Sequence, residues 1–416
     1  LSKTNRQKIL PIAPIRGMIY SREGIILAEN KPMYSLQVIP EKITDVDQLI
    51  IDLREIIHID DKDIERFKFL SNKKRRFERI SIKENLNEIE VALFSVNRHR
   101  FSSVDVVESF FRHYPLGKSL AHSIGYVARI DEDDLNSISK SGLNSNYIAT
   151  THIGKVGIEK SYESYLHGKV GYQKVEVNAE GRVIRVLEKT NPQPGKNLYL
   201  SIDLSLQDIA IKSLGDRKGA IVAMDPRNGD VLALVSSPSY DPNEFSSGID
   251  TSIYKLLLSS ENKPLVNRAL QGKYPPGSTI KPFLGLIALD NEVVALQEEV
   301  WCPGWFSLEG HEHRYRDWKK EGHGHTNLNK AIVESCDVFF YQLAYQLGID
   351  QIHKSLSTFG FGASSGVDIT GEKSGLLPSR EWKKKKNKGA WFPGETLIIG
   401  IGQGYSLTTP VQLAAA

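Results

Sequence analysis

Alternating hydrophobic and polar positions mark the first half of the chain, a pattern typical of half-buried β-strands. Residues 16–28 predict a strand, a turn at Arg22-Glu23-Gly24 and a second strand. Residues 172–187 predict another hairpin, with its turn at residues 178–181. Three segments with helical spacing, two of them with acidic first turns, predict helices over 45–55, 61–70 and 131–142. The first half is therefore expected to be mixed but rich in strands.

The densest turn signal is Asn191-Pro192-Gln193-Pro194-Gly195, and it predicts a domain boundary there, with domains at 1–195 and 196–416. After it, a strand is predicted at 198–202 and a hairpin on either side of Asp225-Pro226-Arg227-Asn228-Gly229. Helical patterns follow at 203–214, 280–289 and 329–347. Strands followed by helices favour an α+β class, with a largely antiparallel sheet flanked by helices in the second domain.

Composition narrows the class of protein. The 416 residues are 40% hydrophobic and 25% charged, which fits a globular chain of two or three domains. The formal net charge of +3 argues against a dedicated nucleic-acid binder, and two cysteines exclude a disulfide-stapled scaffold. No run approaches the roughly 18–20 apolar residues of a membrane span. The run of four lysines at 383–386 is interpreted as a solvated surface loop.

The sharpest chemical pattern is Tyr274-Pro275-Pro276-Gly277-Ser278-Thr279-Ile280-Lys281-Pro282. The turn residues place Ser278 in the first turn of a helix, where free N–H groups favour developing negative charge. Lys281 falls on the same helix face, and a lysine there can take the proton of a serine nucleophile. The alternative is a capping serine beside an exposed lysine. The apolar helix behind the pair favours the chemical interpretation, because a buried lysine needs a partner.

A second polar group lies in an apolar stretch. Ser335-Cys336-Asp337 is flanked by Ala331-Ile332-Val333 and Val338-Phe339-Phe340. Its polar side chains are either satisfied core groups or site residues. Together with Ser-x-x-Lys upstream, the site interpretation is favoured.

These motifs resemble those of the serine penicillin-binding transpeptidases, whose signature is Ser-x-x-Lys, Ser-x-Asn and Lys-Thr-Gly. The chain is most similar to the elongation-specific class B penicillin-binding proteins, and the resemblance covers nearly all of it. The matching segments also include Arg16-Gly17-x-Ile19, Ser237 to Asn243, Arg314 to Lys319, Gly322 to Gly324, and Gly400 to Tyr405.

The resemblance implies an N-terminal, β-rich pedestal followed by a transpeptidase domain. It implies a peptidoglycan D,D-transpeptidase in which Ser278 attacks a D-Ala-D-Ala stem peptide, releases D-Ala and forms an acyl-enzyme that a second stem peptide resolves. Lys281 would be the acylation base, Ser335 would relay the proton, and Asp337, in place of Asn, would orient the substrate or Lys281. β-Lactams would acylate Ser278, whose N–H would form half of an oxyanion hole.

The third motif departs from the family pattern. Lys140-Ser141-Gly142 precedes Ser278, and Lys373-Ser374-Gly375 matches a different stretch of the family. The chain stops at Ala416, before the strand that would carry Lys-Thr-Gly. The transpeptidase domain is therefore expected to lack its C-terminal part, and the chain as given is expected not to complete turnover.

The two cysteines form a third constellation, because Cys302 and Cys336 bracket several histidines and Asp317. Thiolates, an imidazole and a carboxylate suit a tetrahedral zinc site. The resemblance implies four ligands, with Cys302 replacing the usual Asp: Cys302, Asp317, His323 and Cys336. A Cys302–Cys336 disulfide and two buried free thiols are the alternatives.

The resemblance further implies a place at the periplasmic face of the bacterial inner membrane, held by one N-terminal anchor that this chain does not contain. Residues 1–195 would contact membrane proteins of the elongation complex, including a glycan polymerase. Alternatives that share or keep Ser278 are a D,D-carboxypeptidase, a β-lactamase, and a non-catalytic scaffold or β-lactam sensor. A β-lactamase is disfavoured by the large first domain.

Overall fold

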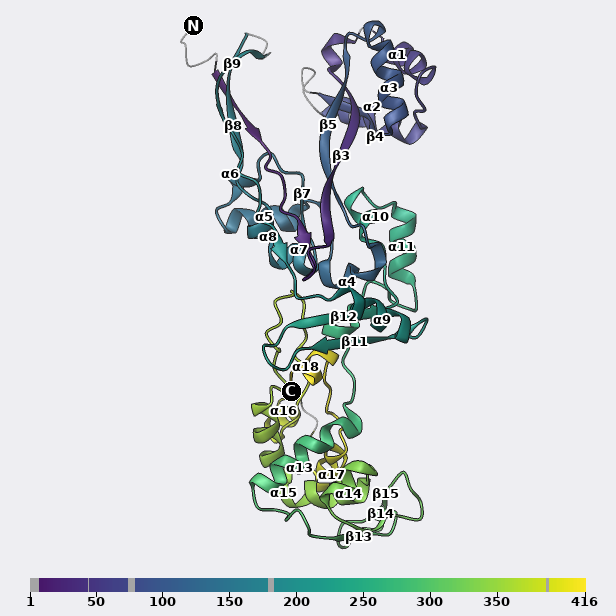
Figure 1. Ribbon diagram of the computed structural model, residues 1–416, viewed down its shortest axis with the longest axis vertical. Helices are drawn as coiled ribbons and strands as arrows, with labels where there is room; N and C mark the ends of the chain where they lie inside the picture. Colours follow the sequence, from purple (N-terminus) through teal and green to yellow (C-terminus); the bar gives the residue numbers. More distant parts are fainter. Residues whose placement is uncertain (1–6, 44, 74–78, 179–182, 387–388) are drawn as a thin grey trace. The chain divides into compact units, whose positions relative to one another are not determined.

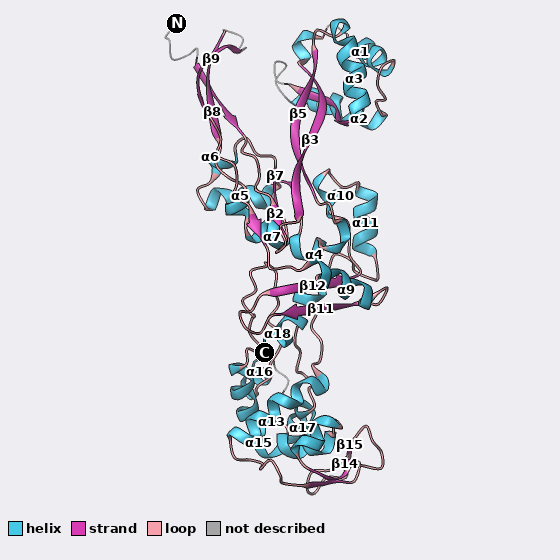
Figure 2. Cartoon of the chain, viewed as in Figure 1, coloured by secondary structure: helices cyan, strands magenta, loops and turns pink. Residues whose placement is uncertain are grey.

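The structure is a computed structural model that describes the chain except residues 1–6, 44, 74–78, 179–182 and 387–388 (Figure 1). The chain divides into two units. The first comprises Leu1–Gly117, Ile124–Leu200 and Asp241–Thr251. The second comprises Lys118–Ser123, Ser201–Tyr240 and Ser252–Ala416. Both units contain helices and strands, in line with the α+β prediction (Figure 2).

A sheet built on two long antiparallel strands organises the first unit. Strand β3 (Ile26–Val38) pairs with β5 (Val104–His113) from Glu29↔His113 to Val38↔Val104. The other members are β2 (Ile19–Tyr20), β4 (Ile80–Leu86) and β10 (Leu198–Tyr199). The predicted hairpin at 16–28 is confirmed, with Gly24 at φ 80° in the turn. The strand predicted at 198–202 is only two residues long in the structure, and it pairs in parallel with β2.

Three helices cover one end of this sheet: α1 (Val46–Arg54), α2 (Asp61–Lys73) and α3 (Glu88–Asn97). The predictions at 45–55 and 61–70 are confirmed. Asp45 caps α1 by accepting from the N–H groups of Asp47 and Gln48, which explains where that helix begins. Their apolar faces meet the sheet in a core that includes Leu36, Leu53, Phe67, Ile82 and Phe94.

A second, antiparallel sheet of the first unit has the order β1 (Gln7–Ile12), β8 (Gly171–Val177) and β9 (Val183–Thr190). It confirms the hairpin arms predicted at 172–187, while residues 179–181 of the predicted turn lie outside the described residues. The helix predicted at 131–142 is α5 (Glu132–Lys140), capped by Asp131. The remaining elements of this part are β6 (Val127–Arg129), β7 (His152–Gly154), α6 (Asn144–Tyr147), α7 (Gly157–Ser161) and α8 (Glu163–Leu166).

A buried ionic cluster holds distant segments of the first unit together. Glu159, with no exposed side chain, accepts from Arg16 Nε and from Arg112 Nε, each at 2.7 Å. Arg16 also pairs with Glu163 at 2.7 Å. Burial alone would raise the pKa of Glu159, but the charges of the two arginines outweigh it and hold that pKa below its usual value. Removing Glu159 would leave Arg112 as a buried charge without compensation.

In the second unit, β11 (Gly219–Met224) and β12 (Val231–Ser237) form the predicted antiparallel hairpin. Helix α9 (Leu204–Leu214), predicted at 203–214, packs on it through Ala210 against Ala233 and Val235. Short helices elsewhere in the chain are α4 (Ala121–Ile124), α10 (Pro242–Ser246), α11 (Thr251–Ser259), α12 (Arg268–Gln271) and α18 (Pro410–Ala415).

His122 is a buried polar residue of the second unit. Its ring lies edge-on to Tyr240, with centroids 5.2 Å apart, and Nε2 lies 3.4 Å from the carbonyl oxygen of Pro238. Burial lowers the pKa of His122 to about 4, because the charged ring would lose its hydration.

A helical body forms the larger part of the second unit. Its helices are α13 (Lys281–Asp290), α14 (Leu328–Val333), α15 (Asp337–Thr358), α16 (Arg380–Lys385) and α17 (Pro393–Gly400). Two small antiparallel sheets accompany them: β13 (Val300–Cys302) with β16 (Gly324–Thr326), and β14 (Trp305–Phe306) with β15 (Tyr315–Arg316). The helix predicted at 280–289 is confirmed as α13. The continuous helix predicted at 329–347 is wrong, because the chain breaks between α14 and α15.

The interpretation of residues 383–386 as a solvated loop is wrong for 383–385, which are helical, and the solvated part of it is also wrong for Lys383. This side chain lies on α16, is 3% exposed, and pairs with Glu395 at 2.6 Å. Lys383 Nζ also donates to the carbonyl oxygen of Ala390 at 2.5 Å and lies 4.9 Å from the ring centroid of Phe392. Partners from a later segment thus decide the environment of one lysine in the run.

Within the described ranges, no helix has both the length and the apolar character needed to cross a membrane.

Candidate active site

Ser278 lies exposed in a short 3₁₀ turn, Gly277–Ile280, that leads into α13. Hydrogen bonds from a later segment fix the turn. Tyr274 and Thr408 exchange backbone hydrogen bonds of 2.9 and 2.8 Å, and Gly277 N donates to the carbonyl oxygen of Gly402 at 2.9 Å. A Cβ on Gly402, whose φ is 68°, would lie 2.2 Å from Gly277 O, so only glycine allows this approach. The serine is thus presented to solvent on a rigid support.

Lys281 is the first residue of α13 and is 1% exposed. Its Nζ donates to Ser335 O at 2.9 Å, to Ser335 Oγ at 3.0 Å and to Asp337 Oδ1 at 2.6 Å. The three contacts match the three N–H bonds of a lysine ammonium. The prediction that a buried lysine here has a partner is confirmed by the Asp337 pair.

Ser335 lies at the break between α14 and α15, with a φ of 55°. Side chains other than glycine rarely adopt this left-handed conformation, and such strain is concentrated at functional sites. The break turns Ser335 toward α13, where its Oγ donates to Ser278 Oγ at 2.8 Å. Among the described residues, the hydrogen-bonded link from Lys281 to Ser278 therefore runs through Ser335.

The four predicted catalytic residues form one chain of contacts: Ser278, Ser335, Lys281 and Asp337. Its exposed end is a hydroxyl and its buried end is an ion pair. With Lys281 as the neutral amine, such an arrangement can accept a proton from the exposed hydroxyl through an intermediate hydroxyl, which is the chemistry that a serine nucleophile needs.

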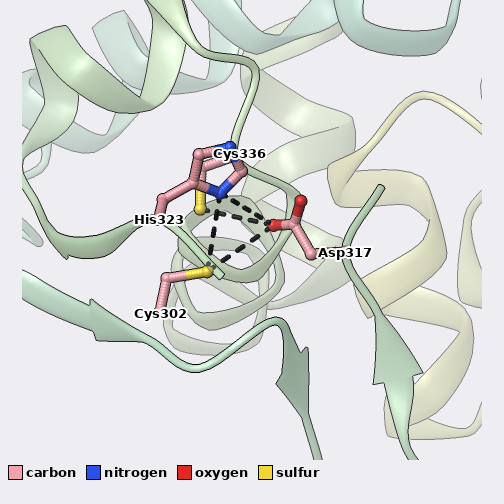
Figure 3. A group of neighbouring side chains, drawn as sticks. All are labelled: Cys302, Asp317, His323 and Cys336. Carbon is pink, nitrogen blue, oxygen red and sulfur yellow. Dashed lines mark hydrogen bonds and ion pairs between the residues drawn. The ribbon is translucent and has the colours of Figure 1, made fainter. Parts of the chain in front are cut away.

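The second predicted constellation is also assembled. Cys302 Sγ, Asp317 Oδ2, His323 Nδ1 and Cys336 Sγ lie within 4.8 Å of one another, and all four residues are buried (Figure 3). Cys302 ends β13, Asp317 follows β15, His323 precedes β16, and Cys336 precedes α15. Both cysteines are free thiols, so the structure has no Cys302–Cys336 disulfide. This cluster could hold a metal ion.

Protonation in the cluster follows its surroundings. Burial raises the pKa of the Cys336 thiol well above its usual value. Burial would also raise the pKa of Asp317, but hydrogen bonds from the backbone N–H groups of Lys319 and Val338 hold that pKa below its ordinary value. The cluster thus contains an ionised carboxylate that both thiols approach.

Close packing of two loops brings these ligands together. A Cβ on Gly322, whose φ is 77°, would lie 2.1 Å from Cys302 O. Glycine at this position therefore lets the segment before His323 approach the end of β13. Cys336 directly follows Ser335, so the cluster lies beside the proposed proton relay.

Sequence reasoning missed several contributors to the site. Phe340 places its ring centroid 5.4 Å from Lys281 Nζ. Trp318 Nε1 donates to Glu334 O, directly before Ser335, at 3.1 Å. Gly402 supports the nucleophile turn. Phe340 is one helical turn after Asp337 on α15, so helix spacing could have identified it, whereas the other two contacts join segments far apart in sequence.

Comparison with known proteins identifies two family matches. Residues 11–200 match the penicillin-binding protein dimerisation domain, and residues 219–416 match the penicillin-binding protein transpeptidase domain. The chain is 47% identical over 415 residues to the peptidoglycan D,D-transpeptidase MrdA of Escherichia coli (strain K12), covering 100% of this chain and 66% of that protein. The corresponding protein of Acinetobacter baumannii is 45% identical, with 100% and 61% covered. The chain thus spans about two thirds of the length of these relatives.

Two solved structures are similar to this chain along almost its whole length. A crystal structure of Pseudomonas aeruginosa PBP2 in complex with WCK 5153 is 41% identical, with a TM-score of 0.73 over 98% of this chain and 69% of that one. A complex between PBP2 and MreC from Helicobacter pylori gives 31% identity and a TM-score of 0.84, over 98% and 76% of the two chains.

Proposed function

The chain belongs to the class B penicillin-binding proteins, as a homologue of the peptidoglycan D,D-transpeptidase MrdA (PBP2), and from this premise we propose that it cross-links peptidoglycan stem peptides during cell elongation. The observation that carries the proposal is the chain of contacts from exposed Ser278 through Ser335 to the buried Lys281–Asp337 pair. It provides a nucleophile and a path for its proton in one place.

Ser278 Oγ attacks the carbonyl carbon between the two D-Ala residues of a donor stem peptide. Lys281 enters this step as the neutral amine, its ammonium having first given one proton to solvent. The proton of Ser278 then passes through Ser335 Oγ to the Lys281 amine, and the N–H of Ser278 donates to the developing oxyanion. Ser335 then gives a proton to the leaving nitrogen, so that D-Ala departs and an acyl-enzyme remains. Asp337 holds Lys281 in place through their 2.6 Å ion pair. The amine of a second stem peptide attacks the ester and regenerates Ser278.

The test is covalent labelling of the purified native-length protein by a fluorescent penicillin. A β-lactam resembles the D-Ala-D-Ala end and leaves a stable acyl group on Ser278. Label is expected on the wild type and none on Ser278→Ala, with Ser357→Ala, an exposed hydroxyl on α15, as the matched control. Absence of label on a folded wild type would favour a scaffold, and rapid release of label would favour a β-lactamase. Release of D-Ala without cross-linked product would favour a carboxypeptidase.

We further propose that the cluster of Cys302, Asp317, His323 and Cys336 binds zinc. A tetrahedral ion with bonds of about 2.0–2.3 Å has ligand atoms about 3.3–3.8 Å apart. Four of the six separations in the cluster lie in this range: the two sulfur–oxygen separations are 3.7 and 3.4 Å, Cys302 Sγ lies 3.6 Å from His323 Nδ1, and the nitrogen–oxygen separation is 3.5 Å. All six are within 4.8 Å. The donor set and its spacing therefore fit the ion.

Bound zinc would supply structural bracing rather than chemistry on the substrate. Cys336 would hold the start of α15, and with it the strained Ser335, in place. Metal analysis of protein purified without chelator should find close to one equivalent of zinc. Less than a few tenths of an equivalent would contradict this part of the proposal.

We propose that residues 1–195 form a pedestal domain and residues 196–416 the transpeptidase domain, and that the protein works at the periplasmic face of the inner membrane, held by an N-terminal anchor. Support for partners comes from relatives: a Helicobacter pylori PBP2 is solved with MreC, and another similar structure concerns the structural coordination of polymerization and crosslinking by a peptidoglycan synthase complex. Membrane proteins of the elongation complex, including a glycan polymerase, would then contact the pedestal.

A further inference from the structure

The two thiols of the metal cluster share one polar partner. Cys302 Sγ lies 3.7 Å and Cys336 Sγ 3.4 Å from the same oxygen, Asp317 Oδ2. The two sulfur atoms lie within 4.8 Å of each other, and both residues are buried. A disulfide bond is about 2.05 Å long, so the sulfurs need to approach by less than about 3 Å to bond. No third cysteine exists in the chain to compete for either one.

Zinc binding and disulfide formation use the same two sulfur atoms, Cys302 Sγ and Cys336 Sγ. A thiolate bound to an ion is not free to attack a disulfide, whereas the metal-free pair is free once loss of the ion opens the loops that bury both thiols. We propose that Cys302 and Cys336 form a redox-sensitive pair in which bound zinc and a Cys302–Cys336 disulfide are mutually exclusive states of one site. The inference rests on the proposed zinc site and adds a modification that the site undergoes when the ion is lost.

The oxidant is a disulfide, such as oxidised glutathione. One cysteine attacks a sulfur of the oxidant and releases one reduced thiol. The second cysteine then attacks the mixed disulfide, releases the other reduced thiol and closes the Cys302–Cys336 bond. The metal-free protein loses two electrons and two protons, and the oxidant gains them as two thiols.

Closure of this bond acts on the proposed active site through the backbone. Cys336 directly precedes α15 and follows Ser335, whose φ of 55° is held by the turn between α14 and α15. Its backbone N–H donates to Ala331 O at 2.9 Å, which fixes that turn. Drawing Cys336 Sγ away from Asp317 toward Cys302 pulls on this turn and shifts Ser335 Oγ relative to Ser278. The oxidised protein should therefore react more slowly with β-lactams than the reduced protein.

The experiment compares zinc-loaded and chelator-treated protein, both incubated with oxidised glutathione, by free-thiol counting, intact mass and peptide mapping. The metal-free protein is expected to lose both thiols and about 2 Da and to yield a cross-linked peptide pair containing residues 302 and 336, with the zinc-loaded protein reacting at least about tenfold more slowly. Cys302→Asp, which keeps a metal ligand but removes one thiol, should gain a glutathione adduct instead of losing 2 Da. Penicillin labelling before and after oxidation gives the functional readout.

Three outcomes would overturn the inference: unchanged thiols in the metal-free wild type, glutathione adducts in place of the internal bond, or equal oxidation rates with and without zinc. The wild-type comparison needs no variant, so a poorly folded Cys302→Asp does not affect it. If the protein binds zinc but never forms the disulfide, this inference is contradicted while the proposed zinc site is supported. If the reduced protein is not labelled by penicillin on Ser278, the proposed function is contradicted. The thiol result is independent of this outcome, because thiol counts do not depend on acylation.

Discussion

Replacing Gly402 with alanine should impair the nucleophile turn more than it impairs the fold. The new Cβ would lie 2.2 Å from Gly277 O, while ordinary contact begins at 3.4 Å. The two segments must therefore move apart by about 1.2 Å, and Gly277 is bonded directly to Ser278. Misplacing a reacting group by about 1 Å costs on the order of 100-fold in rate. The second-order rate of acylation by a penicillin should fall by about that factor.

The assay measures acylation rates with a fluorescent penicillin, together with the thermal midpoint of unfolding. Alanine in the left-handed region also costs about 1–2 kcal/mol by itself. Gly366→Ala is the matched control, since Gly366 has a φ of 85° and a Cβ added there would meet nothing within 4 Å. Both variants should lose similar stability from the backbone, but only Gly402→Ala should lose acylation. Acylation of Gly402→Ala within about threefold of Gly366→Ala would refute the reasoning, because it would show that the turn absorbs the displacement.

Three further predictions concern buried charges. Glu159→Gln leaves the buried Arg112 without its carboxylate, while Arg16 keeps Glu163, and should lower the free energy of unfolding by about 3–5 kcal/mol, measured in urea. Lys383→Met should lower it by about 2–3 kcal/mol, less than for a fully buried pair because the Glu395 side chain is 22% exposed. His122 has a pKa of about 4 in the folded state, against about 6.5 when unfolded. The unfolded state therefore binds its proton first, and stability should rise by about 3 kcal/mol from pH 4 to pH 6.5.

Matched variants check each of these expectations. Lys384→Met removes a neighbouring exposed lysine and should leave stability within about 0.5 kcal/mol of the wild type. An equal loss from both lysine variants would contradict the buried pair. Glu132→Gln, at an exposed position of α5, serves the same purpose for Glu159. His122→Gln should remove its part of the acid sensitivity, and an unchanged pH slope in that variant would show that other groups cause it.

Local signals in the sequence were enough to predict several helix starts, one hairpin and the residues of the candidate site. Asp45 and Asp131 cap helices because a carboxylate satisfies N–H groups only two or three residues away. Turn residues located the hairpin between β11 and β12. The order of Ser278, Lys281 and Ser335 pointed to one site because a motif is a local arrangement, and the structure brings these residues within hydrogen-bonding distance.

Non-local partners decided the rest. The apolar run from 329 to 347 has the pattern of one helix, yet it breaks at Ser335 because Lys281 and Ser278, from a distant segment, bond to that residue. Lys383 looks like one of four solvated lysines until Glu395 is placed beside it. Helix propensity and charge runs describe a residue's neighbours in sequence, and they contain no information about such partners.

The sequence by itself determined the class of fold, the order of the motifs and the residue types available for chemistry, because these depend on neighbours along the chain. Only the tertiary structure decided that Lys281 reaches Ser278 through Ser335, that Gly402 supports the nucleophile turn, and that four ligands from separate segments meet within 4.8 Å. The reason is physical: each of these contacts joins residues whose approach depends on how the second unit packs as a whole.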